Sequence, residues 1–226
     1  MGQFWKLINL DKCETIELGK LGEQWLGGTG CNLFAKLAAL RNPSDLARKR
    51  RVFSHHLFNL DAIGDWTGDR LVCIGDYTET YPEGLLTKED LATLETRFGS
   101  KGALYHLAEE EEWPEAKVNG WCYDPDTFAS KCILRNITQR VYVRLRELAA
   151  GNCGDLEQVL LSYTCWSSCT LCSMEEYDLS KGEWAGHRFD VGGLDEQAAI
   201  KEGWKDVTKE VVERVKLIWD SEHTWG

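Results

Sequence analysis

The chain has 226 residues, enough for one large domain with a self-sufficient hydrophobic core. Its 37 acidic residues outnumber 26 basic ones, and the net charge of −11 argues against nucleic acid as the main partner, because phosphate backbones are held by clustered cations. No stretch has the length of a membrane span and no secretion signal is visible, so we expect a cytoplasmic protein, a single domain over 1–226, with reduced thiols and no membrane partner.

The first third of the chain predicts a β-hairpin followed by two helices. An apolar strand begins at Phe4 and runs into the polar turn Asn9–Lys12, and a second strand ends at Gly19. Asn and Asp tolerate the backbone of such a turn, which is why we predict a hairpin here. Apolar spacing then predicts a helix over Asn32–Leu40. Ser44 offers an N-cap for a second helix that ends near Phe58.

The middle of the chain carries a Trp-x-Gly-x-Arg element, a strand and a capped helix. The element is Trp66–Arg70, and it leads into an apolar strand over Arg70–Asp76. The sequence Thr87-Lys-Glu-Asp then resembles a capping box, with Asp in place of the usual Glu. We therefore predict that a helix begins there and ends near Gly99.

The last part of the chain predicts two more hairpins and a C-terminal helix. A second hairpin covers 132–143, and a third has its turn at 177–182 and a return strand that carries Trp184. An apolar stripe at helical spacing predicts that the final helix is amphipathic and closes over a sheet. The stripe consists of Val207, Val211, Val215 and Ile218.

Two segments of the chain are similar to each other. Gly64–Arg70 matches Gly182–Arg188, and each copy lies downstream of a hairpin whose turn begins at an asparagine. Two degenerate repeats over 1–85 and 128–195, related by a pseudo-twofold axis, would explain this order. The alternative interpretation is a chance match between short motifs.

The motifs also carry a family resemblance. The opening Met1–Lys12, together with Trp66–Tyr77, Leu161–Ser168 and Trp184–Gly186, resembles a family of fungal and some bacterial proteins that begin Met-Gly-x-x-Trp-Lys and carry Trp-x-Gly-Asp-Arg. The likeness spans most of the chain. It implies a cytosolic single-domain protein and brings no activity, fold or catalytic residue with it.

The densest group of polar and aromatic side chains surrounds the first Trp-x-Gly-x-Arg element. Its members are Asp65, Trp66, Asp69, Arg70, Asp76 and Tyr77. In a functional interpretation, the three aspartates converge on a small polar ligand or a hard cation such as Mg²⁺ or Ca²⁺, with Trp66 as a wall. In a structural interpretation, Asp69 pairs with Arg70 or caps a turn, and the glycine at position 68 supplies a conformation that a Cβ forbids.

The second copy suggests where a site could differ between the halves. Trp184 and Arg188 keep their places, so the shared residues indicate scaffold, although both remain candidate ligand contacts. His187 replaces Asp69, and across a pseudo-twofold axis the two could act as a base–acid pair.

Three closely spaced cysteines raise the question of a metal site. The C-x3-C-x2-C spacing of the iron–sulfur site in radical-SAM enzymes occurs at Cys165, Cys169 and Cys172. Those enzymes place the motif early in a long partial barrel, whereas only a short stretch of chain follows Cys172, so we reject this interpretation. A zinc site would need a fourth ligand, such as Cys153 or His187. A pair of thiol-bearing strands explains the cysteines equally well, so we predict no metal centre, and no fingerprint identifies a cofactor.

These patterns together favour an α+β fold, a mostly antiparallel sheet built from β-hairpins with helices packed on one side. The 10 tryptophans are typical of core and pocket walls. The leading hypothesis for function is a non-enzymatic protein that binds a small polar ligand or a protein partner. The alternatives are an enzyme that uses the aspartate group with Arg70 and His187, and a thiol-metal protein.

Overall fold

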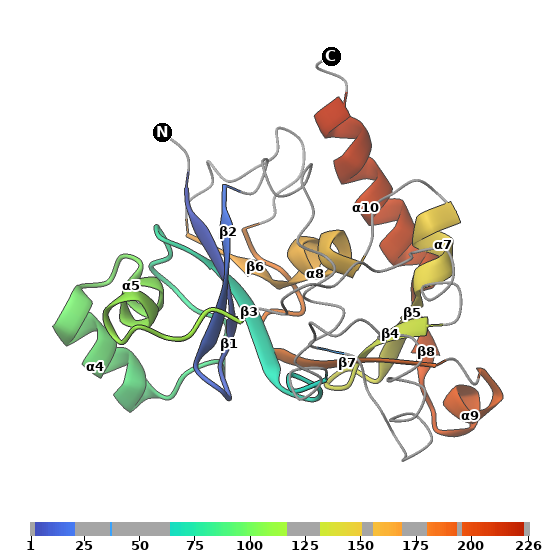
Figure 1. Cartoon of the computed structure of the whole chain (residues 1–226), viewed down its shortest axis with the longest axis horizontal. Helices are drawn as coiled ribbons and strands as arrows, with labels where there is room; N and C mark the ends of the chain where they lie inside the picture. The colour runs from blue at the N-terminus through green and yellow to red at the C-terminus, as the bar shows by residue number, and fades with distance from the viewer. Residues whose placement is uncertain are drawn as a thin grey trace, which may run out of the picture.

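Antiparallel strands form one open sheet at the centre of the molecule. The computed structural model describes residues 3–20, 37, 64–116, 132–150, 156–168, 180–193 and 196–223, and in these residues the fold is α+β (Figure 1). In chain order the described elements are β1 (Trp5–Asn9), β2 (Glu14–Gly19), β3 (Arg70–Gly75), α4 (Lys88–Phe98), α5 (Ala103–Glu110), β4 (Cys132–Asn136), β5 (Val141–Arg144), α7 (Leu145–Ala150), α8 (Leu156–Thr164), β6 (Cys165–Trp166), β7 (His187–Gly193), α9 (Glu196–Lys201), β8 (Lys205–Asp206) and α10 (Thr208–His223).

The sheet has the strand order β2-β1-β3-β7-β4-β5-β8, with β6 added beside β3. The hairpins β1–β2 and β4–β5 lie where the sequence predicts them, and they join through the antiparallel neighbours β3 and β7. The parallel pairs described are the short contacts of β6 with β3 and of β8 with β5. The prediction of a mostly antiparallel sheet is therefore confirmed.

Helices cover both faces of the sheet, so the expectation of helices on one side is wrong. Successive strand residues point to opposite faces. Leu7 belongs to the core cluster under α8 and α10, whereas its neighbour Ile8 packs in a second cluster with Leu104 of α5. At the far end of the sheet, Ile133 packs with Ala199 of α9. All residues of β1 and β4 are buried, and strands buried on both faces need a cover on each side.

Two helices follow the predicted signals closely. Helix α4 has a complete capping box, because the Thr87 hydroxyl accepts from the Asp90 backbone while the Asp90 carboxylate accepts from the Thr87 backbone. Its C-cap is Gly99. Of the predicted stripe, Val211, Val215 and Ile218 of α10 are buried, whereas Val207, just before the helix, is partly buried. None of the helices in the described part of the chain combines the length and apolar character that crossing a membrane requires.

Some expectations fail or fall outside the described residues. Trp184 lies in the turn 183–186, and β7 begins only at His187, so the predicted return strand does not carry Trp184. The predicted helices over 32–40 and 44–58 lie outside the described residues, apart from Leu37, which is helical and fully buried.

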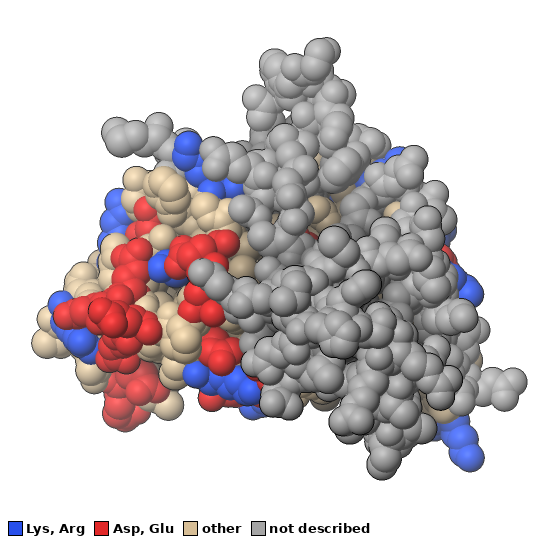
Figure 2. Space-filling model, in the orientation of Figure 1, with Lys and Arg blue, Asp and Glu red and all other residues tan. Residues whose placement is uncertain are grey.

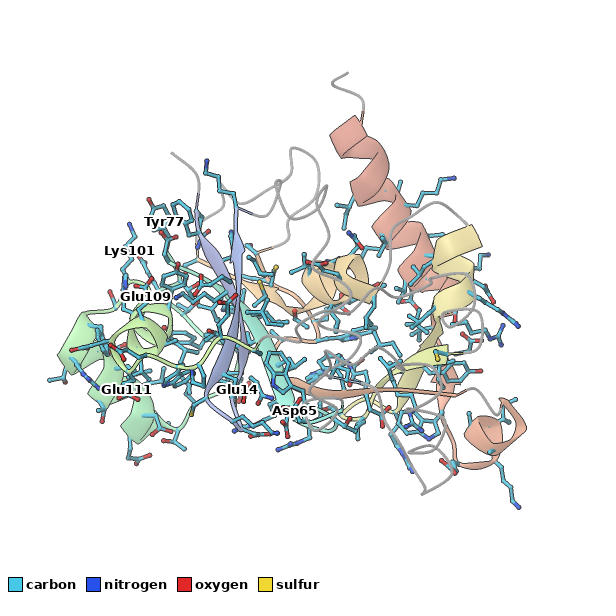
Figure 3. The ribbon with its side chains drawn as sticks, in the orientation of Figure 1. Glu14, Asp65, Tyr77, Lys101, Glu109 and Glu111 are labelled. Carbon is cyan, nitrogen blue, oxygen red and sulfur yellow. The ribbon has the colours of Figure 1, made fainter. Side chains whose placement is uncertain are left out.

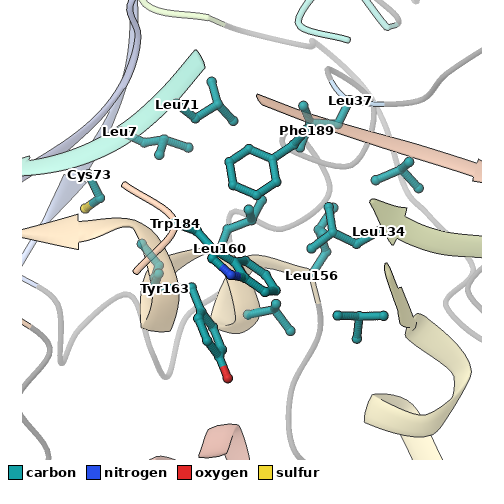
Figure 4. Packing of buried hydrophobic residues seen from close by; sticks show 14 of the residues in the cluster. Leu7, Leu37, Leu71, Cys73, Leu134, Leu156, Leu160, Tyr163, Trp184 and Phe189 are labelled. Atoms are coloured by element: carbon teal, nitrogen blue, oxygen red, sulfur yellow. The ribbon is translucent and has the colours of Figure 1, made fainter. Parts of the chain in front are cut away.

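The main core cluster joins the two halves of the sheet. Phe189 of β7 is fully buried between the strands and α8, and Trp184 lies beside it with ring centroids 6.1 Å apart (Figure 4). Tyr163 of α8 stacks on the other side of Trp184. This aromatic row leads from the centre of the core to the surface beside α10.

Candidate functional site

The two Trp-x-Gly-x-Arg elements meet where β3 pairs with β7. Arg70 lies directly opposite Arg188 in the antiparallel register. The backbone makes two further hydrogen bonds of 2.7 Å, from the Gly68 N–H to the carbonyl of Phe189 and from the Gly186 N–H to the carbonyl of Leu71. Both glycines have positive φ, at 83° and 78°, which a side chain disfavours. The elements therefore join the two sheet halves as scaffold.

The hairpin turns beside these elements also match. The Asn9 side chain accepts the backbone N–H of Lys12, and the Asn136 side chain accepts that of Gln139, each at 3.1 Å. Both turns contain a residue with positive φ, Cys13 at 54° and Arg140 at 57°. Such paired contacts are what two copies of one unit about a twofold axis would make. An origin of the halves as internal repeats stays a prediction.

Asp11 ties the two arginines together. Its carboxylate accepts from Arg70 Nε at 2.8 Å and from Arg188 Nη1 at 2.7 Å. Burial alone would raise the pKa of Asp11, but the hydrogen bonds from Arg70 and the charge of Arg188 outweigh it and leave that pKa lowered. Arg188 also donates to the carbonyl of Gly68. Both predicted arginines thus lie in an ion cluster that holds the hairpin turn to the β3–β7 junction.

The three predicted aspartates do not converge. Asp69 accepts from the Asn9 amide at 2.8 Å, and Asp65 lies 3.9 Å from the Lys12 ammonium. Asp76 lies at the opposite end of β3, where it accepts the Phe4 backbone N–H. Figure 3 shows this separation, with Asp65 at one end of the strand and Tyr77 at the other. The carboxylates are therefore scattered and individually paired.

The aromatic members of that group are also apart. The Trp66 ring is fully buried, and its indole N–H donates to the Glu14 carboxylate. Tyr77 instead lies beside the Lys101 ammonium, which is 4.0 Å from the centre of its ring. Trp66 is therefore a core residue before the start of β3, whereas Tyr77 follows its end, so the two rings form no shared wall.

Asp69 and His187 each bond to an asparagine of their own half. The Asn136 amide donates to His187 Nδ1 at 2.9 Å, in the same way as the Asn9 amide donates to Asp69. Burial lowers the pKa of His187. No hydrogen bond or ion pair joins Asp69 to His187 among the described contacts, so the proposed base–acid pair gains no support from their geometry.

The described cysteines form no metal centre. Cys165 lies in β6 directly opposite Cys73 of β3, and both thiols are fully buried. Cys169 and Cys172 lie outside the described residues. Among the residues that the structure describes, no group of three metal-ligating side chains comes together. Cys165 therefore contributes to the core, as the thiol-bearing strand interpretation expects.

Four consecutive glutamates, Glu109–Glu112, begin in the last turn of α5 and lie on the surface. Asp and Glu side chains gather over α4 and α5 in the view of Figure 2. Part of this charge is balanced, because Arg97 pairs with Glu110 and Glu111 and the buried Lys6 ammonium pairs with Glu109. The run is exposed from Glu109 onward. It is a solvated helix end.

A cavity of about 590 Å³ opens between α10 and the turn that carries Trp184. This volume is within the range of small-molecule sites, which is about 300–1,000 Å³. The walls combine aromatic, aliphatic and charged side chains from α8, β5, β8, α10 and two turns. They are Gln139, Val141, Tyr163, Glu183, Trp184, Lys205, Val207, Glu210, Val211, Glu213, Arg214 and Leu217.

Tyr163 contributes a largely buried ring and a hydroxyl to this cavity. Only 6% of the residue is exposed, and its ring stacks on Trp184 with centroids 4.2 Å apart. The Arg214 guanidinium lies over the same ring, 4.7 Å from its centre. The Tyr163 hydroxyl points out of the core cluster (Figure 4), and no hydrogen bond to it occurs within the described part of the chain.

The electrostatics keep this hydroxyl neutral. Burial raises the pKa of Tyr163 to about 12, with Glu183 and Glu210 acting in the same direction and Arg214 against them. A phenol in this state can donate and accept hydrogen bonds at neutral pH, but it cannot act as a base. Tyr163 therefore supplies this cavity with a neutral hydrogen-bonding group.

Sequence reasoning identified one residue of the cavity, Trp184, and missed the others. Tyr163 lies on an almost wholly buried helix, so its surroundings look like core in the sequence. Arg214 lies at the flank of the apolar stripe of α10, where a half-buried cation bordering solvent is ordinary. The pairing of Trp184 with Gln139, through the indole N–H at 3.1 Å, also depends on the tertiary structure.

Comparisons of the chain with protein-family models, with curated proteins and with solved structures found no match.

Proposed function

We propose that the protein is a non-enzymatic binding protein that takes a small, partly apolar ligand in the cavity beside Tyr163 and Trp184. The observation that carries this proposal is Tyr163, a residue only 6% exposed that lines an open cavity of about 590 Å³. Its hydroxyl has no hydrogen bond within the described part of the chain, so a polar group of a ligand can pair with it while apolar groups contact the walls.

The cavity walls suit a ligand with both apolar and polar parts. Val141, Val211 and Leu217 offer aliphatic surface, and the side-chain amide of Gln139 lies nearby. Binding sites of this size typically use apolar walls for affinity and a few polar groups for orientation.

The scattered aspartates also favour a binding protein over the alternative of an enzyme. Asp65, Asp69 and Asp76 each have a structural partner, and Asp76 lies at the opposite end of β3 from the other two. An enzyme based on them would have to break these pairings before it could engage a substrate.

The test uses three probes that share a phenyl ring and a butyl chain, namely phenylbutanol, phenylbutylamine and phenylbutyrate. Leu217→Trp places a large ring in the cavity, at a residue that is 50% exposed and tolerates size. Ile200→Trp is the matched control, because Ile200 is 68% exposed on α9, away from the cavity.

We expect at least one probe to bind the wild-type chain and the Ile200→Trp variant, and its affinity to fall at least about tenfold in Leu217→Trp. Isothermal titration calorimetry measures this, and circular dichroism checks that both variants fold. The proposal is wrong if all three probes fail to bind, or if Leu217→Trp binds them as well as the control does.

A further inference from the structure

We infer that the ligand of this cavity carries a cationic group, such as a primary ammonium, which the carboxylates of the cavity rim and the Tyr163 hydroxyl hold together. This inference rests on the proposed function and adds to it the chemical class of the ligand. It depends on the balance of charges in the walls and on which of those charges already have partners.

Three carboxylates and two cations line the cavity. The carboxylates belong to Glu183, Glu210 and Glu213, and the cations to Lys205 and Arg214. The excess is therefore one negative charge, before internal pairing is considered.

Arg214 is already engaged. Its guanidinium donates to the Ser162 carbonyl at 3.1 Å, lies over the Tyr163 ring, and approaches Glu183 to 4.0 Å. These contacts hold the guanidinium against the wall and satisfy part of its hydrogen-bonding capacity. It is therefore a poor partner for a further anion.

The carboxylates on α10 are less engaged. Glu213 contacts Lys209 at 3.9 Å, but both side chains are largely exposed, and such pairs hold weakly in water. Glu210 makes no ion pair or side-chain hydrogen bond within the described part of the chain. Both carboxylates therefore remain available to a cation in the cavity.

Tyr163, Glu183 and Glu210 line the same cavity. Burial is the main reason why the pKa of Tyr163 is raised, and the two carboxylates act in the same direction, in keeping with this shared position. An ammonium group donates three hydrogen bonds and accepts none. The phenol oxygen and the two carboxylates offer the acceptors that such a group needs, while the aliphatic walls contact the rest of the ligand.

Lys205 is the feature that would favour the opposite charge. It lies on β8, and its side chain is exposed and makes no ion pair in the described residues. A ligand with a carboxylate could use it. Because the experiment includes an anionic probe and Lys205→Gln, it distinguishes this case from the inferred one.

The experiment compares the three phenylbutyl probes by calorimetry at low salt. We expect the wild-type chain to bind phenylbutylamine at least about tenfold more tightly than phenylbutanol, the ratio that one charge-assisted hydrogen bond supplies. Phenylbutyrate should bind more weakly than either. Raising the salt concentration should narrow the preference for the amine, because screening weakens exposed charges.

The variant Glu210→Gln with Glu213→Gln should remove the preference for the amine, because it should weaken the binding of phenylbutylamine more than that of phenylbutanol. Glu83→Gln is the matched control, since Glu83 is an exposed carboxylate in the turn before α4 and lies outside the cavity. If the double variant folds poorly, Glu213→Gln alone serves, because that side chain is 65% exposed; it should reduce the preference at least about twofold.

Two results would overturn the inference while leaving the proposed function standing. One is that phenylbutanol and phenylbutylamine bind equally, or that the amine preference survives in the glutamine variants. The other is that phenylbutyrate binds best and loses its affinity in Lys205→Gln. If none of the probes binds, the proposed function itself fails.

Discussion

The Asn136 side-chain amide donates a hydrogen bond to Nδ1 of His187 at 2.9 Å. Because the Asn136 carbonyl oxygen already accepts from the Gln139 backbone, the orientation of the amide is determined. An amide nitrogen can only donate, so His187 must present an unprotonated Nδ1 and carry its proton on Nε2. The fold therefore holds His187 in one neutral tautomer.

Lowering the pH should destabilise the fold through His187. Burial lowers the pKa of His187 below its usual 6.5, so the unfolded chain takes up this proton first. The free energy of unfolding should fall as the pH drops below about 6.5 and level off below the folded pKa. The slope due to His187 should stay under ~1.4 kcal/mol per pH unit, because this residue accounts for a difference of at most one bound proton between the unfolded and the folded chain. Urea unfolding of wild type and His187→Gln, from about pH 8 to about pH 5, measures the difference; identical curves would contradict the prediction.

The two motif glycines should differ in their tolerance of a methyl group. Gly68 has a φ of 83° and open space around an added Cβ, so Gly68→Ala should cost about 1–2 kcal/mol through backbone strain alone. At Gly186 the added Cβ would also lie 2.5 Å from Leu85 Cδ1, so Gly186→Ala should cost more. Thermal unfolding of both variants measures these losses. If the clash with Leu85 contributes, the double variant Gly186→Ala with Leu85→Ala should lose less stability than the sum of the two single variants. Equal losses for the two glycines would show that the clash relaxes.

Removing one partner of the buried ion pair between β4 and β7 should be costly. Arg135 donates to Asp190 through Nε and Nη2, both at 2.6 Å, and both side chains are more than nine-tenths buried. Asp190→Asn should destabilise the fold by about 3–5 kcal/mol, because the arginine charge is left uncompensated. Glu213→Gln, which breaks an exposed pair, should cost at most about 1 kcal/mol in the same urea experiment. Similar losses for the two variants would argue against a burial effect.

The described cysteines should differ in how fast a thiol reagent labels them. Cys13 is exposed, whereas burial and the neighbouring Cys165 and Glu157 raise the pKa of Cys73 well above its usual value. Iodoacetamide should therefore modify Cys13 in the folded protein, and Cys73 and Cys165 only after unfolding. Peptide mass spectrometry measures the rates at each site. Fast labelling of Cys73 under native conditions would mean that β6 separates from β3 readily.

Much of the secondary structure could be predicted because its signals are local. The asparagine turns at Asn9 and Asn136, the Thr87 capping box and the apolar stripe of α10 all depend on residues within one or two turns of each other. The extent of β7 was harder, because Trp184 looks like a strand residue in the sequence. In the structure, Gly186 with its positive φ keeps that segment in a turn.

The sequence by itself determined the hairpins, the capped helix, the α+β class and the shared Trp-x-Gly-x-Arg scaffold. The tertiary structure alone decided that helices cover both faces, that the aspartates around Arg70 lie apart, and that a cavity opens beside Tyr163. The walls of this cavity come from α8, from the turn before β7 and from α10. Tyr163 of α8 and Arg214 of α10, which meet there, are 51 positions apart in the chain. Side chains that meet only through packing leave no periodic signal, so this candidate site could be recognised only after the chain had folded.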